Sequence, residues 1–304
     1  MAYVPDELLN CIVFVGCYDA DGNERYVGSG FWVSRPGPED IANAYRPTYL
    51  VTAAHVIDWI RKHVSPGDNR VLIRVNTKLG SQKWVETPLP FWKVHPDNGA
   101  DLAVFKTTMD LTWHHLSWPV EAFVTAQSIQ DDGRKIELGD ELFFAGLFWP
   151  HTGEKRNIPI VRVGNVAALR GEKILNRDDH LMDAYLVESR SIGGLSGSPV
   201  FIDIHTAKRD YAGTSQFIRG NFPIKFRLLG VMHGHFTVPD VQPDADAGKE
   251  KIPLNMGIAI VVPSERILEV LEFFSQEELA EAEIFREAFR AVKLPMSAES
   301  DINS

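Results

Sequence analysis

Short apolar segments separated by polar turns fill most of the chain. A first series lies between residues 10 and 107, with apolar segments at 11–18, 26–33, 48–53, 71–75 and 102–107. A second series lies between residues 120 and 262, with segments at 141–147, 158–169, 184–188, 198–202, 226–232 and 257–262. Segments of strand length with turn residues between them and no helical periodicity predict β-strands. This many of them predict closed or sandwiched antiparallel sheets.

The pattern changes to helical spacing near the C-terminal end. Residues 275–278 (SQEE) carry the capping-box signature of a helix that ends near residue 292. Before them, apolar residues recur at helical spacing, at Ile267, Leu268, Leu271 and Phe274. From residue 264 onward the chain has ten acidic and four basic residues, a net charge of −6. We expect a solvated helical tail that docks through its apolar stripe, with a partner-binding or regulatory arm as the alternative.

These patterns divide the chain into three parts. We expect an N-terminal β domain at 1–118, a second β domain at 119–263 and a helical acidic tail at 264–304. The linker between the two β domains is expected around residues 108–119. Residues 240–251 (DVQPDADAGKEK) are polar, contain Gly and Pro and show no periodicity, which predicts a mobile loop inside the second domain.

Composition and charge exclude several classes of protein. The net charge of −10 and the lack of a basic run interleaved with aromatic residues argue against a nucleic-acid partner. No apolar run reaches the roughly 20 residues of a membrane span, and residues 1–10 lack the basic start and apolar core of a secretory signal. Cys11 and Cys17, the two cysteines, have no CxxC spacing and offer no disulfide or structural zinc pattern. We therefore expect a cytoplasmic protein with no membrane partner.

The sharpest local signal for chemistry is a serine in a glycine-rich turn. Residues 193–200 (GGLSGSPV) run from this turn directly into an apolar strand. Such a turn exposes the Ser196 hydroxyl and points backbone N–H groups the same way. Acyl transfer needs both features, because it requires a nucleophile and donors for the oxyanion. The amides of Gly194 and Ser196 are the candidate donors, and the alternative for the motif alone is an ordinary hairpin turn.

A serine hydroxyl needs a base, and His55 has the matching context. It follows an apolar strand that ends in small residues, and a short helical segment at 56–62 comes after it. Asp101 opens the apolar strand 101–105 and is the candidate group that orients the imidazole. Taken singly, His55 is typical of a capping or half-buried structural histidine, and Asp101 of a turn residue. Together with Ser196 they complete a catalytic set.

The order of these three residues along the chain discriminates among folds. His55, Asp101, Ser196 is the order of chymotrypsin-like double barrels, whereas subtilisins and α/β-hydrolases use other orders. On these motifs the sequence resembles the trypsin-like serine peptidase superfamily over about residues 10–270, and within it the bacterial HtrA-type and glutamyl-endopeptidase-like branches. The matching segments are 28–33 (GSGFWV), 52–55 (TAAH), 101–104 (DLAV) and 194–199 (GLSGSP), with weaker matches at 138–140, 163–166 and 257–263.

The resemblance implies an all-β fold, a chymotrypsin-like double six-stranded antiparallel β-barrel followed by C-terminal helices. It also implies a trypsin-like serine protease, a hydrolase in which Ser196 attacks the peptide carbonyl, His55 transfers the proton and Asp101 orients His55, with Gly194 and Ser196 forming the oxyanion hole. Protein or peptide substrates are then the expected partners, no cofactor is required, and the acidic helices are a candidate surface for a regulatory partner. Two alternatives stay open: a noncatalytic peptide-binding module on the same fold, and an esterase or other acyl hydrolase that uses the same triad.

The sequence departs from digestive members of the superfamily in ways that bear on activation. The residue before Ser196 is Leu195, where those enzymes carry the aspartate that pairs with a new N-terminal ammonium. We therefore expect that no N-terminal processing is needed. The cysteines that flank the histidine loop of secreted members are missing, in agreement with a reducing compartment. No PDZ module is expected after the helices.

In this superfamily the specificity pocket is walled by a segment about six residues before the serine and by the strand after it. Here these are Arg190 and the strand that contains His233, Gly234 and His235. An arginine and two imidazoles favour an acidic side chain before the scissile bond, through charge-assisted hydrogen bonds. In one alternative Arg190 points outward or pairs with Glu188. In another the two histidines ligate a metal, although no third ligand has a known spacing.

Overall fold

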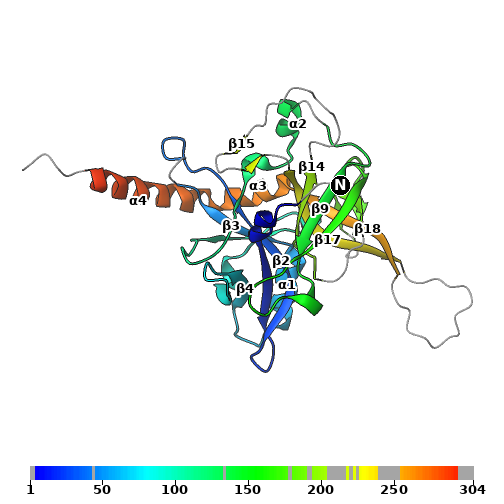
Figure 1. The fold of residues 1–304 in the computed structure, drawn as a ribbon, viewed down its shortest axis with the longest axis horizontal. Helices are drawn as coiled ribbons and strands as arrows, with labels where there is room; N and C mark the ends of the chain where they lie inside the picture. Colours follow the sequence, from blue (N-terminus) through cyan, green and yellow to red (C-terminus); the bar gives the residue numbers. More distant parts are fainter. Residues whose placement is uncertain are drawn as a thin grey trace, which may run out of the picture.

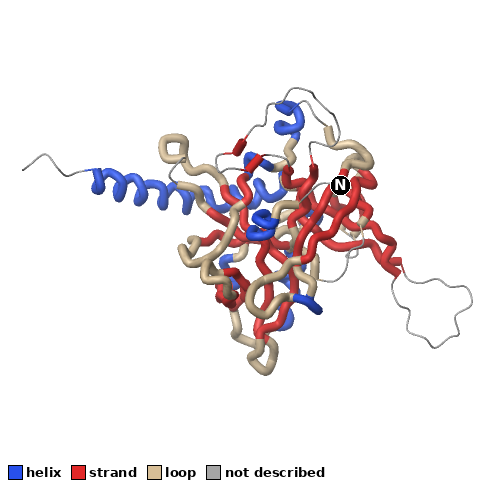
Figure 2. The backbone as a smooth tube through the Cα atoms, viewed as in Figure 1, coloured by secondary structure: helices blue, strands red, loops and turns tan. Residues whose placement is uncertain are grey.

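The structure is a computed structural model of the 304-residue chain. It describes residues 4–42, 45–132, 135–176, 180–189, 194–203, 217–218, 222–223, 226–238 and 254–293. Two predicted features, Arg190 of the expected pocket and the loop at 240–251, lie outside the described residues. Strands make up the central body of the molecule, and a long helix projects from it at the C-terminal end (Figures 1 and 2).

The N-terminal half forms an eight-stranded sheet. Its strands are β1 (Ile12–Tyr18), β2 (Glu24–Ser34), β3 (Thr48–Thr52), β4 (Arg70–Asn76), β5 (Gln82–Pro88), β6 (Lys93–Val94), β7 (Ala103–Thr107) and β8 (Trp118–Pro119). Their order is β5-β4-β1-β2-β3-β7-β6, with antiparallel neighbours throughout, and β8 pairs with β2 in parallel. Helix α1 (Ala54–His63) contributes Ile57 to the core of this sheet, where it lies with Trp32 and Ile73.

The second half closes into a six-stranded barrel in the order β10-β13-β18-β17-β14-β9, with β9 pairing back to β10. The barrel strands are β9 (Glu141–Gly146), β10 (Ile160–Ala168), β13 (Tyr185–Glu188), β14 (Pro199–Asp203), β17 (Phe226–Val238) and β18 (Leu254–Pro263). Closure gives every barrel strand two neighbours and so removes exposed edges. Two small sheets pair β11 (Ile174–Leu175) with β12 (Leu181–Met182) and β15 (Phe217–Ile218) with β16 (Phe222–Pro223).

The helices of the described residues lie in connections and in the C-terminal segment. Besides α1 they are α2 (Ala126–Asp132), α3 (Glu265–Leu271), α4 (Ser275–Lys293) and the 3₁₀ helices η1 (Asp6–Cys11), η2 (Leu89–Phe91), η3 (Asn98–Ala100), η4 (Val120–Ala122), η5 (Trp149–His151) and η6 (Glu272–Phe274). Among the described helices, none has the length and apolar character to cross a membrane.

The architecture confirms the predicted fold class: it is mostly β, with a closed antiparallel barrel beside a second curved sheet and helices at the C-terminal end. One detail differs from six strands in each barrel. The N-terminal sheet has eight strands, and in the described part of the chain β5 and β6 each pair with one neighbour only. β6 lies between η2 and Pro96, whose nitrogen has no N–H to donate to a ladder.

A core shared by the two halves explains why the first strand is apolar at almost every position. Successive residues of a strand point to opposite faces. Val13 and Val15 of β1 point into the N-terminal core, whereas Phe14 points into a core that also contains Phe143 and Phe201 of the second barrel. The rings of Phe143 and Phe201 stack with centroids 5.2 Å apart. β1 is therefore buried on both faces, and the continuous apolar run at 11–18 follows from this position.

The C-terminal helices dock through their apolar stripe and through ion pairs. Ile267 and Leu271 of α3 are fully buried, and the ring of Phe274 lies 5.5 Å from that of Tyr49 on β3, centroid to centroid. Arg35, just after β2, donates to Glu278 and to Glu272, each at 2.8 Å. The excess negative charge of this segment is therefore partly balanced by a cation of the N-terminal sheet.

Replacing Phe274 by alanine is expected to lower the free energy of unfolding by about 3–5 kcal/mol, because it empties a core position that is only 2% exposed. The matched control is Phe273→Ala. The neighbouring ring is 50% exposed, so its loss should change stability by less than about 0.5 kcal/mol. Urea denaturation followed by circular dichroism measures both values. Equally small effects in the two variants would mean that the helices are not part of the cooperative fold.

Candidate active site

Strand pairing brings His55 and Asp101 together. β3 and β7 are antiparallel neighbours, and the last pair of their ladder joins Thr52 to Ala103. The chain leaving β3 and the chain entering β7 therefore lie side by side. His55, in the first turn of α1, meets Asp101, which lies two residues before β7. Two motifs 46 residues apart thus become neighbours through one strand ladder.

Asp101 binds both the side chain and the backbone of His55. Its Oδ2 lies 2.8 Å from Nδ1 of the imidazole, and its Oδ1 accepts the backbone N–H of His55 at 2.9 Å. The backbone carbonyl of Asp101 also accepts the N–H of Ala54 at 3.2 Å. The N-cap residue Ala53 has no side-chain cap, so Asp101 caps helix α1 from another strand. A carboxylate at Nδ1 holds the tautomer in which Nε2 is the basic atom.

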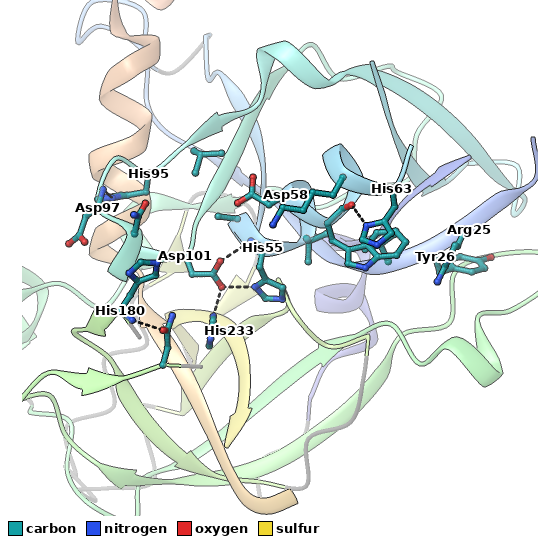
Figure 3. A pocket seen from close by; sticks show the side chains of 18 residues that line it. Arg25, Tyr26, His55, Asp58, His63, His95, Asp97, Asp101, His180 and His233 are labelled. Carbon is teal, nitrogen blue, oxygen red and sulfur yellow. Dashed lines mark hydrogen bonds and ion pairs between the residues drawn. The ribbon is translucent and has the colours of Figure 1, made fainter. Parts of the chain in front are cut away.

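A second imidazole binds the same carboxylate. Nδ1 of His233, on β17, makes a short hydrogen bond to Oδ2 of Asp101, and the two imidazole rings lie edge to face with centroids 5.3 Å apart (Figure 3). The register of β17 against β18 shifts between Met232 and Gly234, so His233 is the extra residue of a β-bulge. A bulge re-aims the side chain it carries. Sequence reasoning placed His233 in the specificity pocket and missed its contact with Asp101, because no local motif signals a bulge here.

The Asp101 carboxyl combines deep burial with strong partners. Its side chain is 7% exposed, and burial by itself raises its pKa. Attraction to His55 and the hydrogen bonds from His233 and His55 act the other way and outweigh burial, so the pKa of Asp101 lies well below its ordinary value. The group is therefore a carboxylate at neutral pH and a permanent acceptor for both imidazoles.

Two glycines allow the tight turn that carries Ser196. Gly194 and Gly197 have φ values of 96° and 83°, a region that favours glycine. A Cβ at Gly197 would also lie 2.2 Å from the carbonyl oxygen of Ser29. The Ser196 hydroxyl donates to the carbonyl oxygen of His233 at 3.1 Å. In the described part of the chain no hydrogen bond uses the N–H of Gly194 or of Ser196, the two predicted oxyanion donors.

Ser29 of β2 ties this turn to both halves of the molecule. Its hydroxyl donates to the carbonyl oxygen of Gly194 and accepts the N–H of Leu147, each at 2.8 Å. Its backbone N–H donates to the carbonyl oxygen of Ser196 at 2.9 Å. At Gly28 a Cβ would lie 3.1 Å from that same oxygen and 2.8 Å from Val56, which leaves no room for a side chain. The GSG segment of β2 therefore holds the serine turn in place through these hydrogen bonds and close contacts.

A cavity of about 740 Å³ opens beside His55 (Figure 3). The walls combine the apolar face of Trp59 with polar groups from α1, β2 and the loop before Asp101. The charged and titratable lining residues, besides His55, Asp101 and His233, are Arg25, Tyr26, Asp58, Lys62, His63, His95, Asp97 and His180. Such a mixed lining suits an extended polar chain better than a purely apolar ligand.

The structure brings together only part of the predicted specificity pocket. Gly234 and His235 are half-buried on β17 and pair with Ile260 and Ala259 of β18. The predicted wall residue Arg190 lies outside the described residues, so the acidic preference stays a prediction. Leu195 is fully buried in the core of the second barrel, where its side chain offers no ion pair.

His55, Asp101 and His233 are residue types that also bind zinc, and one ligand atom of each lies within 4.8 Å of the others. These atoms are already joined by hydrogen bonds that a metal ion would have to break. We therefore interpret the group as a hydrogen-bonded cluster and not as metal ligands. His235, the second histidine of the sequence motif, is not a member of this cluster.

Comparisons with known proteins return similar folds at low identity. No family model matches the sequence, and a search of curated proteins finds no match. The protease domain of MamO from Magnetospirillum magneticum shares 15% identity, with 87% of this chain and 97% of that chain covered and a TM-score of 0.47. Deg5 shares 14% identity, with 88% and 90% covered and a TM-score of 0.49. The inactive form of the Rv3671c protease shares 15% sequence identity, with 86% of this chain and 88% of that chain covered and a TM-score of 0.42. At these values the likeness concerns the fold at most, and the fold rests on the strand order described above.

The Asp101→Asn variant is expected to be less stable than the wild type at pH 7, by about 1–3 kcal/mol, and closer to it in acid. The pKa of Asp101 is lower in the folded than in the unfolded chain. Its contribution to stability is therefore complete above about pH 4 and is lost as the pH falls through the folded-state value. Urea unfolding of both proteins at pH 7, 5, 4 and 3 measures the difference. A difference that grew towards pH 3 would show that burial outweighs the imidazole partners.

Proposed function

We propose that the chain is a serine endopeptidase that cleaves peptide bonds with Ser196, His55 and Asp101. The observation that carries the proposal is the His55–Asp101 pair. Both oxygens of a buried carboxylate bind one histidine, at 2.8 and 2.9 Å, beside a cavity and next to a glycine turn that carries a serine. The same three residues carry the resemblance to trypsin-like serine peptidases, which supports the proposal independently of the geometry.

In the proposed reaction Ser196 Oγ attacks the carbonyl carbon of the scissile peptide, and its proton passes to Nε2 of His55. Asp101 stabilises the imidazolium through Nδ1–H. The oxyanion accepts the N–H groups of Gly194 and Ser196. His55 then gives the proton to the leaving nitrogen, the C–N bond breaks and an acyl-enzyme is left. Water attacks this ester with His55 again as the base, which releases the acid product and restores the serine.

The hydroxyl of Ser196 has to turn before this proton transfer begins. It donates to the carbonyl oxygen of His233, and the proposed reaction requires it to donate to Nε2 of His55 instead. Because one hydrogen bond replaces another, the exchange costs little free energy, on the order of 1 kcal/mol. Catalytic hydrogen bonds are often long or misaligned until substrate binds. The observed rotamer is therefore compatible with the proposed role of Ser196.

A fluorophosphonate probe is expected to label the wild-type chain at Ser196, because the probe requires a serine activated by a base. Ser196→Ala should not react, and His55→Ala should react at least about 10³-fold more slowly. Peptide mapping by mass spectrometry locates the label. The matched control is Ser198→Ala: this hydroxyl is buried and has no hydrogen-bond partner among the described groups, so its loss should leave labelling unchanged.

The same protein distinguishes the two alternatives. A chain that is labelled and hydrolyses esters, yet cleaves no member of a diverse peptide library, would be an acyl hydrolase of another kind. A chain that binds peptides in the cavity and is not labelled at Ser196 would be a noncatalytic binding module. Either result would contradict the endopeptidase proposal.

A peptide library tests the predicted pocket. We expect faster cleavage after Glu or Asp than after Lys or Arg, because a cationic wall binds a carboxylate and leaves an ammonium without a partner. Arg190→Ala should reduce this preference by at least about tenfold if the guanidinium bonds to the substrate carboxylate. Small or aliphatic preferences that are unchanged in Arg190→Ala would show that the pocket is a plain apolar slot.

A further inference from the structure

We propose that His233 is a positioning residue of the triad, which lowers the basicity of His55 by sharing the Asp101 carboxylate with it. The inference rests on the proposed function, since it assigns to His233 a part in controlling the proposed base. Sequence reasoning placed His233 against the substrate, whereas its observed contact is with the acid of the triad.

The geometry makes Oδ2 of Asp101 a common acceptor. Nδ1 of His55 and Nδ1 of His233 both point at this one oxygen. The His233 side chain is only 13% exposed, whereas that of His55 is 40% exposed. Both rings line the cavity, but His233 is the more deeply buried and His55 the more exposed of the two.

The backbone around His233 holds its ring in this place. The carbonyl of Met232 accepts the N–H of Gly197 at 2.8 Å, and the N–H of Met232 donates to the carbonyl of Ser198 at 2.9 Å. The carbonyl of His233 accepts the Ser196 hydroxyl. His233 thus contacts Asp101 with its ring and Ser196 with its backbone, and the bulge in β17 is anchored to the serine and to the two residues that follow it.

One carboxylate carries one negative charge, and two imidazoles compete for it. A hydrogen bond from neutral His233 already withdraws part of that charge from His55. A proton on His233 would neutralise the carboxylate and place a positive charge beside His55, with 5.3 Å between the ring centroids. Both effects disfavour the imidazolium form of His55. His55 would therefore stay neutral, and so able to act as a base, at a lower pH than it would if it were the sole imidazole bound to Asp101.

Other charged and titratable groups line the same cavity as the two imidazoles and are present in every His233 variant. They are Arg25 and Tyr26 from β2, Asp58, Lys62 and His63 from α1, His95 and Asp97 from the loop after β6, and His180 from the segment before β12. On β17 itself, His235 lies two residues after His233. Several have partners of their own. Nε2 of His95 binds Glu269 at 2.9 Å, and Nδ1 of His63 binds the carbonyl of Trp59 at 2.7 Å. A difference in the protonation of His55 between wild type and a His233 variant therefore measures the effect of His233 itself.

The experiment compares wild type, His233→Asn and His233→Ala, with the exposed His114→Ala as the control, all in EDTA. An asparagine amide places an N–H donor near the position of Nδ1 but carries no titratable charge. NMR of ¹⁵N-histidine follows the protonation of His55 directly. In parallel, the rate of fluorophosphonate labelling at Ser196 is measured between pH 5 and 9.

We expect the protonation midpoint of His55 to rise by about one pH unit in His233→Ala, because Asp101 then serves His55 alone. In His233→Asn the rise should be smaller, because the amide still donates to the carboxylate and only the titratable charge is lost. The acid limb of the labelling rate should move up by the same amount. His233→Ala should have a lower plateau rate than His233→Asn, because in His233→Ala Asp101 loses a hydrogen bond that the asparagine amide can still donate. His114→Ala should match the wild type.

Two results would distinguish a failure of the His233 proposal from a failure of the proposed function. Normal labelling at Ser196 with an unchanged or lower His55 midpoint in both His233 variants would overturn the role of His233 and leave the endopeptidase proposal standing. Absence of labelling at every pH, with the midpoint of His55 still raised, would support the sharing of the carboxylate and contradict the proposed function.

Discussion

The carboxylate of Asp101 is the group around which this site is organised. A buried charge is expensive unless hydrogen bonds replace the water it has lost. Here two imidazoles and the backbone N–H of His55 supply them, and the positive end of helix α1 adds a favourable field. The same carboxylate thereby starts the helix, orients His55 and binds the bulge that carries His233. Its low pKa keeps all three contacts in place at neutral pH.

The position of the serine turn depends on how closely the N-terminal sheet and the barrel approach each other. Gly28 and Gly197 lie where backbone meets backbone, and a methyl group at either position would clash with a neighbouring segment. Ser29 lies between them and satisfies polar groups on both sides, which an apolar residue could not do. Contacts of glycine and serine residues therefore position the serine turn against β2 and the start of α1.

The C-terminal helices reach the same region through buried His95. Its Nε2 binds Glu269 on α3, and its Nδ1 accepts the N–H of Asp97, in the loop that leads to Asp101. Helix α3 thus contacts the loop before Asp101 through the hydrogen bond between Glu269 and His95. The apolar stripe of the helices also packs into the core shared by the two halves. Helix α3 is therefore part of the packed fold.

Local sequence determined much of this molecule. The alternation of apolar segments predicts the strands, helical spacing predicts α3 and α4, and the glycines around Ser196 predict the turn, because each of these depends on neighbouring residues alone. The order of His55, Asp101 and Ser196 along the chain pointed to two barrels before any contact was known. Only the tertiary structure decided that His233 turns to Asp101 and that Ser29 binds the serine turn. A bulge re-aims a side chain according to the register of the partner strand, and the packing of the barrel against the N-terminal sheet joins residues more than a hundred positions apart, so no local pattern carries that information.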